Sequence, residues 1–140
     1  MNRKKREDFE LIIPSQIDQI RKVEDFTEKV ALKTSLIDEE RDSLAIAVTE
    51  IVNNAMIHGN KLLPEKNVTI HYTVTPRELI ISIQDEGTGF DPEKLDDPCK
   101  PENLLKDCGR GVFIVRSLLD EVSFHQEATG MKVTLVKILK

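Results

Sequence analysis

The chain has 140 residues, a net charge of −5 at pH 7 and a pI of about 5.3. This length predicts a single domain with its own hydrophobic core, and the acidic balance argues against nucleic acid or an anionic membrane as the main ligand. No run of about 18 apolar residues is present to span a membrane, and no apolar stretch follows the basic start to form a signal peptide, so we expect a cytoplasmic protein. Cys99 and Cys108 fit neither a disulfide framework nor a zinc site.

The predicted elements follow from the spacing of apolar residues. Steps of three and four residues predict helices, whereas alternation predicts strands. The second helix is expected to start at Asp38, where carboxylates in the first turn favour the helix dipole, and to stop at Gly59. In chain order we expect a strand at 9–13, helices at 16–33 and 38–57, strands at 68–74 and 79–83, a helix at 112–119, and strands at 122–125 and 131–139.

This order of elements predicts the fold class. Residues 1–8 are expected to be a solvated tail and residues 9–140 to form the domain. Paired strands and clustered helices predict an α+β fold, a two-layer sandwich with a mixed, mostly antiparallel sheet and three main helices on one face. Residues 91–108 contain prolines and many charges with little periodicity, and such a long loop in a compact domain is usually functional or disordered.

A line of polar side chains runs along the second predicted helix. Glu50, Asn54 and His58 recur every four residues, so they stack on one stripe beside the apolar face. An amide and a carboxylate on adjacent turns suit a magnesium ion that keeps most of its waters and binds substrate phosphates. Glu50 is also placed to act as a general base. The alternatives are a solvated helix face for Glu50, and a helix cap rather than a phosphate donor for His58.

Two glycine motifs frame the long loop. Asp85 ends a predicted strand, and Gly87 and Gly89 after it would let backbone amides approach a ligand, while the carboxylate accepts a hydrogen bond from an exocyclic amine such as that of adenine. Gly109 and Gly111 open a helix, where free N–H groups form an anion site for phosphates. Each motif alone is also compatible with a turn or loop. Neither has the spacing of a dinucleotide fingerprint or a Walker loop. With the helix stripe and the loop between them, they predict a nucleotide site with a lid.

These residues resemble a known superfamily. EIVNNAMIHGN (50–60) is similar to the N-box of the GHKL ATPases, which include gyrase, MutL and histidine kinases. DEGTGF (85–90) and GRGVFIV (109–115) resemble their two glycine boxes, and GMKVTLVKI (130–138) resembles their final strand. The resemblance covers the chain from about Phe9 and is strongest to the small bacterial anti-sigma factor serine kinases.

The resemblance implies a Bergerat-fold domain that binds ATP and Mg²⁺. It makes Glu50 the catalytic base, Asn54 the magnesium ligand and Asp85 the residue that recognises adenine. It places Thr134 behind the adenine, near Asp85, and makes residues 91–108 the lid. The full set of expected nucleotide-binding residues is Asn54, His58, Asp85, Gly87, Gly89, Phe90, Lys106, Gly109, Arg110, Gly111, Val112 and Thr134.

The resemblance also implies a function. In the family, ATP is used to phosphorylate a serine on a small antagonist protein, and the unphosphorylated antagonist releases the sigma factor that the kinase holds. We therefore expect a serine kinase with an antagonist and a sigma factor as partners, with no direct nucleic acid or membrane contact. Members commonly form homodimers, for which the sheet edge or the first helix is available.

Two alternatives remain open at this point. Sporulation-type members carry an arginine just before the second glycine box, where this chain has Asp107 and Cys108, with Lys106 and Arg110 as the nearby cations. This departure allows a nucleotide-gated binding module with little catalysis. The other alternative is a detached catalytic domain of a histidine kinase, against which the lack of a dimerisation helix before Phe9 argues.

Overall fold

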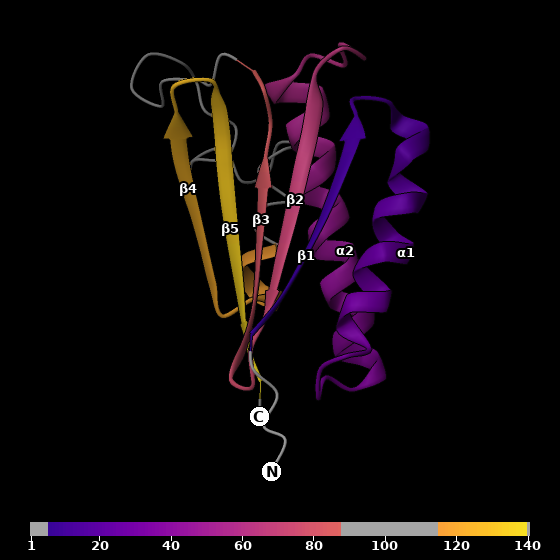
Figure 1. The fold of residues 1–140 in the computed structure, drawn as a ribbon, viewed down its shortest axis with the longest axis vertical. Coiled ribbons are helices and arrows are strands. Elements are labelled where there is room, and N and C mark those ends of the chain that lie inside the picture. Colours follow the sequence, from indigo (N-terminus) through magenta and orange to yellow (C-terminus); the bar gives the residue numbers. More distant parts are fainter. Residues whose placement is uncertain (1–5, 88–114, 140) are drawn as a thin grey trace.

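The computed structural model describes residues 6–87 and 115–139, in which a five-stranded sheet carries helices on one face (Figure 1). The strand order is β1-β2-β3-β5-β4, and all four pairings are antiparallel. The elements are β1 (Glu7–Pro14), the 3-10 turn η1 (Ile17–Gln19), α1 (Ile20–Ala31), α2 (Asp38–Asn54), the π turn η2 (Ala55–Gly59), β2 (Asn67–Val74), β3 (Glu78–Gln84), β4 (Glu121–Glu127) and β5 (Gly130–Ile138). The predicted two-layer α+β fold is confirmed.

The third predicted helix is described only in part. Residues 115–118 are helical, and residues 112–114 of the predicted helix lie outside the described residues. Val115 and Leu119 are buried in the same core as the strands. No helix in the described parts of the chain has the length and apolar character needed to cross a membrane.

The first strand begins at Glu7, two residues before the predicted start at Phe9. Its added residues pair with the end of β2, Glu7 with Val74 and Asp8 with Thr73. The Asp8 carboxylate accepts hydrogen bonds from Arg6 (Nε, 2.9 Å) and from Thr73 (Oγ1, 2.8 Å). Chiefly through Arg6, these bonds hold the pKa of the Asp8 carboxyl well below its usual range. Charged residues are common on edge strands. Because Glu7 and Asp8 are not apolar, the apolar pattern from which the strand was predicted begins only at Phe9.

Helix α1 is shorter than predicted and packs on β2. The apolar pattern from residue 16 divides into the 3-10 turn η1 and then α1. Thr27 of α1 and Tyr72 of β2 are both fully buried, and their hydroxyl oxygens lie 2.7 Å apart. Burial raises the pKa of the Tyr72 phenol to about 12. This hydrogen bond satisfies two polar groups that would otherwise be costly in the core.

Helix α2 ends in a change of helical pitch. It was predicted to continue to Ile57, but regular α-helix stops at Asn54 and the π turn η2 follows. The backbone N–H of Asn60 donates to the carbonyl of Ala55 (2.8 Å), five residues earlier. Single π turns are frequent at functional sites. Lys61 and Leu62 then both adopt positive φ (56°), so the chain reverses sharply after the helix.

Candidate functional site

The polar stripe on α2 is preserved only over its first part. Glu50 and Asn54 lie one turn apart on α2, and both are half-buried. His58 lies in the π turn and is exposed. A π turn holds more residues per turn than an α-helix, because its hydrogen bonds span five residues. The four-residue spacing therefore does not keep His58 in line with Glu50 and Asn54.

Asp85 is the buried carboxylate of the candidate site. It follows β3 directly and is 4% exposed. Its Oδ1 accepts from the backbone N–H groups of Gly87 and Met131, each at 3.0 Å. Burial raises the pKa of the Asp85 carboxyl, and these two hydrogen bonds act against that rise. Within residues 6–87 and 115–139, both of these donors bind Oδ1, and Oδ2 faces Gly59.

Three glycines surround Asp85 so closely that none has room for a side chain. A Cβ at Gly59 would lie within 3.0 Å of Asp85 Oδ2, and one at Gly130 within 3.0 Å of the Asp85 carbonyl oxygen. A Cβ at Gly87 would collide with the carbonyl of Gly59 in the same way. Gly130 also has a φ of +148°, which other residues rarely adopt. The end of η2, the residues that follow β3 and the first residue of β5 therefore meet around this carboxylate.

Asn60 is a buried residue for which the sequence suggested no role. It is 0% exposed, and its side chain makes three hydrogen bonds. Nδ2 donates to Ser15 Oγ (2.7 Å) and to the Asn67 carbonyl (3.0 Å), and Oδ1 accepts from the backbone N–H of Glu86 (2.7 Å). An Asn after Gly at the end of a helix is typical of a cap or turn. Nothing in the sequence therefore indicated its hydrogen bonds to Ser15, Asn67 and Glu86.

Thr134 is not brought to Asp85, contrary to the expectation. It lies on β5 opposite Ser82 of β3, whereas the buried neighbours Val133 and Leu135 point into the core. Side chains alternate between the two faces of a strand, and Asp85 continues the core-facing series of β3. Met131 is the β5 residue beside Asp85, because the Asp85 backbone N–H donates to the Met131 carbonyl and the Met131 N–H donates to Asp85 Oδ1.

Several predicted site residues lie outside the described residues. They are Gly89, Phe90, Lys106, Gly109, Arg110, Gly111 and Val112, together with the lid at 91–108. Glu50, Asn54, His58, Asp85, Gly87 and Thr134 are described, and of these the structure places Gly87 in direct contact with Asp85.

The described residues are compatible with a magnesium ion held mainly by a nucleotide. No group of three His, Cys, Asp or Glu side chains among them is arranged to hold a metal. Magnesium usually binds through one or two protein groups, several waters and substrate phosphates. The half-buried amide of Asn54 is one such group.

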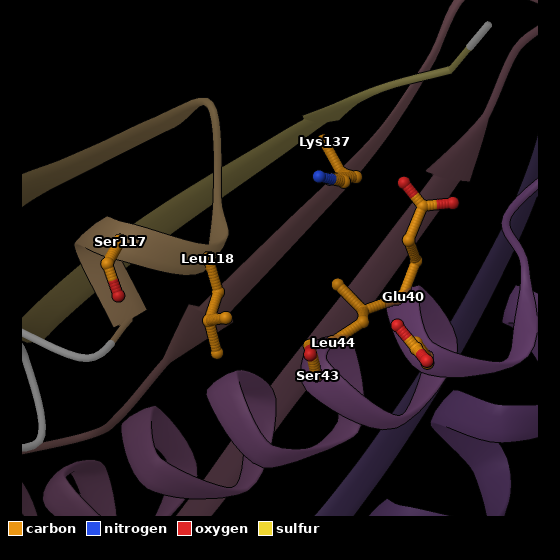
Figure 2. Close-up of a pocket in the computed structure, with 7 residues that line it drawn as sticks. Glu40, Ser43, Leu44, Ser117, Leu118 and Lys137 are labelled. Carbon is orange, nitrogen blue, oxygen red and sulfur yellow. The ribbon is translucent and has the colours of Figure 1, made fainter.

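Two clefts in the described part of the chain lie away from these residues. One, of about 270 Å³, separates the first turns of α2 from helical residues 117–118 and β5. Figure 2 shows Lys137 on one side of this cleft and Glu40, Ser43 and Leu44 on the other. The second, of about 350 Å³, lies between the end of α1 and the start of α2. Neither is lined by Glu50, Asn54 or Asp85.

Comparison with known proteins identifies related sequences and folds. The sequence model of the histidine kinase-like ATPase domain matches residues 13–137. The chain is 30% identical to the serine-protein kinase RsbW of Staphylococcus aureus strains bovine RF122 and MRSA252, over 96% of this chain and 89% of each relative. The crystal structure of the RsbU and RsbW domains of Rv1364c from Mycobacterium tuberculosis matches 95% of this chain with a TM-score of 0.68 and 14% identity. The match spans about a third of that longer chain, at 32%, and supports the fold.

Proposed function

The chain belongs to the histidine kinase-like ATPase family, and we propose that it is an ATP-dependent serine kinase. Its proposed substrate is a small antagonist protein of a sigma factor, phosphorylated in the cytoplasm. The observation that carries the proposal is the buried carboxylate of Asp85 directly after β3, which two backbone donors to Oδ1 hold in place. The similarity to serine-protein kinases named RsbW over 96% of the chain supports the choice of serine as acceptor.

The proposed roles follow from the chemistry of each side chain. Asp85 accepts a hydrogen bond from the exocyclic amine of adenine. Asn54 holds a magnesium ion, which when bound neutralises charge on the phosphates. Glu50 takes the proton of the substrate serine as its oxygen attacks the γ-phosphorus. The bond between that phosphorus and the β–γ bridging oxygen breaks, and ADP leaves.

Glu50→Gln tests the proposed base. We expect this variant to bind Mg-ATP within about threefold of wild type but to transfer phosphate at least a hundredfold more slowly, because general bases contribute about 10²–10⁴ in rate. The measurement is transfer of labelled phosphate from ATP to a candidate antagonist. Glu39→Gln, which removes an exposed carboxylate from the first turn of the same helix, is the matched control. Equal transfer by Glu50→Gln and Glu39→Gln would show that Glu50 is not the base.

A second candidate function is a nucleotide-gated binding module. It is favoured by Asp107 and Cys108, which stand where sporulation-type kinases carry an arginine. In this function, ATP creates a surface for a sigma factor or antagonist, and a homodimer is the proposed assembly. Calorimetry showing Mg-ATP binding, without phosphate transfer to any antagonist that binds the protein, would favour this function over the kinase.

A further inference from the structure

We propose that Asn60 is a positioning residue that fixes the turn carrying Asp85 and thereby sets the preference for adenine over guanine. This inference rests on the proposed function, in which Asp85 recognises the base. Asn60 itself contacts no nucleotide in this proposal. It acts through the backbone of residues 85–87.

The first argument is a closed ring of hydrogen bonds. The Glu86 backbone N–H donates to Asn60 Oδ1 (2.7 Å), and Asn60 Nδ2 donates to the Asn67 carbonyl (3.0 Å). The Asn67 backbone N–H then donates to Glu86 Oε1 (2.6 Å), which completes the ring. Each of the three residues is held by the other two. The ring therefore ties the peptide that directly follows Asp85 to the start of β2.

The second argument is that the far side of Asn60 is anchored as well. Its remaining amide hydrogen is donated to Ser15 Oγ (2.7 Å), and that hydroxyl donates to the Lys66 carbonyl (2.7 Å). Ser15 and Asn60 are both buried, at 1% and 0% exposure. Because both amide hydrogens and the amide oxygen are used, the side chain has one orientation in which every partner is satisfied.

The third argument is the contact between neighbouring residues of the two segments. Gly59, next to Asn60, lies so close to Asp85 that a Cβ on it would collide with Oδ2, and a Cβ on Gly87 would collide with the Gly59 carbonyl. Gly87 N–H also donates to Asp85 Oδ1 (3.0 Å). Movement of Glu86 would therefore move Asp85 and Gly87 together. Adenine and guanine differ at the group that would meet Asp85, a donor in adenine and an acceptor in guanine, so its placement governs discrimination.

The test compares Asn60→Ala with Thr27→Val in the full chain. Both changes remove a buried polar group, but Thr27 contacts Tyr72 on α1 and β2, away from the turn. We expect Asn60→Ala to weaken ATP binding about tenfold and GTP binding about threefold or less. The preference for ATP, expressed as the dissociation constant for GTP divided by that for ATP, should therefore fall. Thr27→Val should leave that ratio within about twofold of wild type, as expected for the loss of one hydrogen bond that does not reach the site.

Amide hydrogen exchange without nucleotide provides a second measurement. Asn60→Ala should speed exchange at the Glu86 and Gly87 amides at least tenfold, whereas Thr27→Val at a similar loss of stability should not single out these two amides. The proposal is overturned if Asn60→Ala keeps the wild-type preference for ATP over GTP, or if Thr27→Val changes that preference by the same factor. If wild type binds neither nucleotide, the proposed function fails, and so does a role for Asn60 in base selection.

Asn60→Asp keeps the test decisive if the alanine variant does not fold. This isosteric change keeps the oxygen that accepts from Glu86 and removes the two amide hydrogens. Because the hydrogen bonds to Asn67 and Ser15 are then lost and the ring opens, we expect Asn60→Asp to lose preference for ATP over GTP as Asn60→Ala does, with a lower melting temperature. A folded Asn60→Asp protein that keeps the wild-type preference for ATP contradicts the proposal.

Discussion

At the scale of single residues, the candidate site depends on how little space is left around Asp85. Its Oδ1 is held by two backbone donors, and a Cβ on either Gly59 or Gly130 would collide with the residue. A rigid carboxylate loses little freedom when it binds a base, which favours affinity. The same closeness makes the site sensitive to one added methyl group.

Gly59→Ala is the prediction that belongs to this scale. The new Cβ would lie within 3.0 Å of Asp85 Oδ2, so we expect the free energy of unfolding to fall by about 1–3 kcal/mol, as in other overpacked sites. ATP affinity should fall at least tenfold because Asp85 is displaced. Urea unfolding and calorimetry are the measurements. In an Asp85→Ala background the carboxylate is absent, so the same glycine change should cost clearly less. Additive costs would argue against the collision.

At the scale of elements, helix α1 is attached to the sheet through a polar as well as an apolar contact. Val23 and Val30 bury apolar area, and the Thr27 and Tyr72 hydroxyls meet between them. The Phe26 ring packs on Tyr72 with centroids 5.3 Å apart. Because the apolar residues alone would tolerate small shifts of the helix, this hydrogen bond helps to define where α1 sits on β2.

Tyr72→Phe tests this attachment. The change leaves the Thr27 hydroxyl buried without its partner, so we expect a loss of about 1–3 kcal/mol in the free energy of unfolding. The double variant Thr27→Val/Tyr72→Phe removes both hydroxyls and should recover most of that loss. Urea denaturation of the two variants measures the difference. A double variant as unstable as the sum of the single ones would show that the hydroxyl pair does not act as a unit.

At the scale of the whole molecule, two carboxylates affect stability in opposite directions. The pKa of Asp8 is lowered by Arg6, His71 and Thr73, so its contribution is present above the unfolded pKa and is lost as pH falls through the folded one. The pKa of Asp85 is raised by burial. Its protonated form is therefore favoured by folding, and stability is lost as pH rises through the raised pKa.

Asp85→Asn measures the stability that is lost when the buried Asp85 carboxyl ionises. As pH rises from about 4, the ordinary pKa of an aspartate, towards 7, wild type increasingly carries a buried charge and the variant does not. We expect the stability of Asp85→Asn relative to wild type to increase over this range in thermal or urea unfolding, while ATP binding is lost. Asp8→Asn should differ in both sign and range, losing relative stability as pH rises towards about 4, the ordinary pKa of an aspartate, and changing little above it. A flat difference for Asp85→Asn would mean that Asp85 ionises freely in the folded protein.

Prediction from the sequence succeeded where periodic patterns carry the information. The alternating apolar residues of β2, β3 and β5 and the helical spacing in α1 and α2 were sufficient for the two-layer fold, which is confirmed. The position of Asp85 directly after a buried strand was likewise visible, and the structure adds a hydrogen bond from the Gly87 N–H to its carboxylate. The magnesium, base and lid assignments stay predictions.

The errors arose where contacts between distant segments decide the structure. Glu7 and Asp8 are polar, and only pairing with β2 makes them part of a strand. Thr134 was misplaced because the sheet register, set by pairing with Ser82, determines which face a β5 side chain occupies.

The sequence by itself therefore determined the layers, the core and the residue types of the candidate site, since these follow from local spacing. Only the tertiary structure decided how the site is held. Asn60 bonds to Ser15, Asn67 and Glu86, which lie 45, 7 and 26 residues away along the chain. Local propensity reports preferences of neighbouring residues, whereas a buried amide takes whichever partners the packed elements bring within reach.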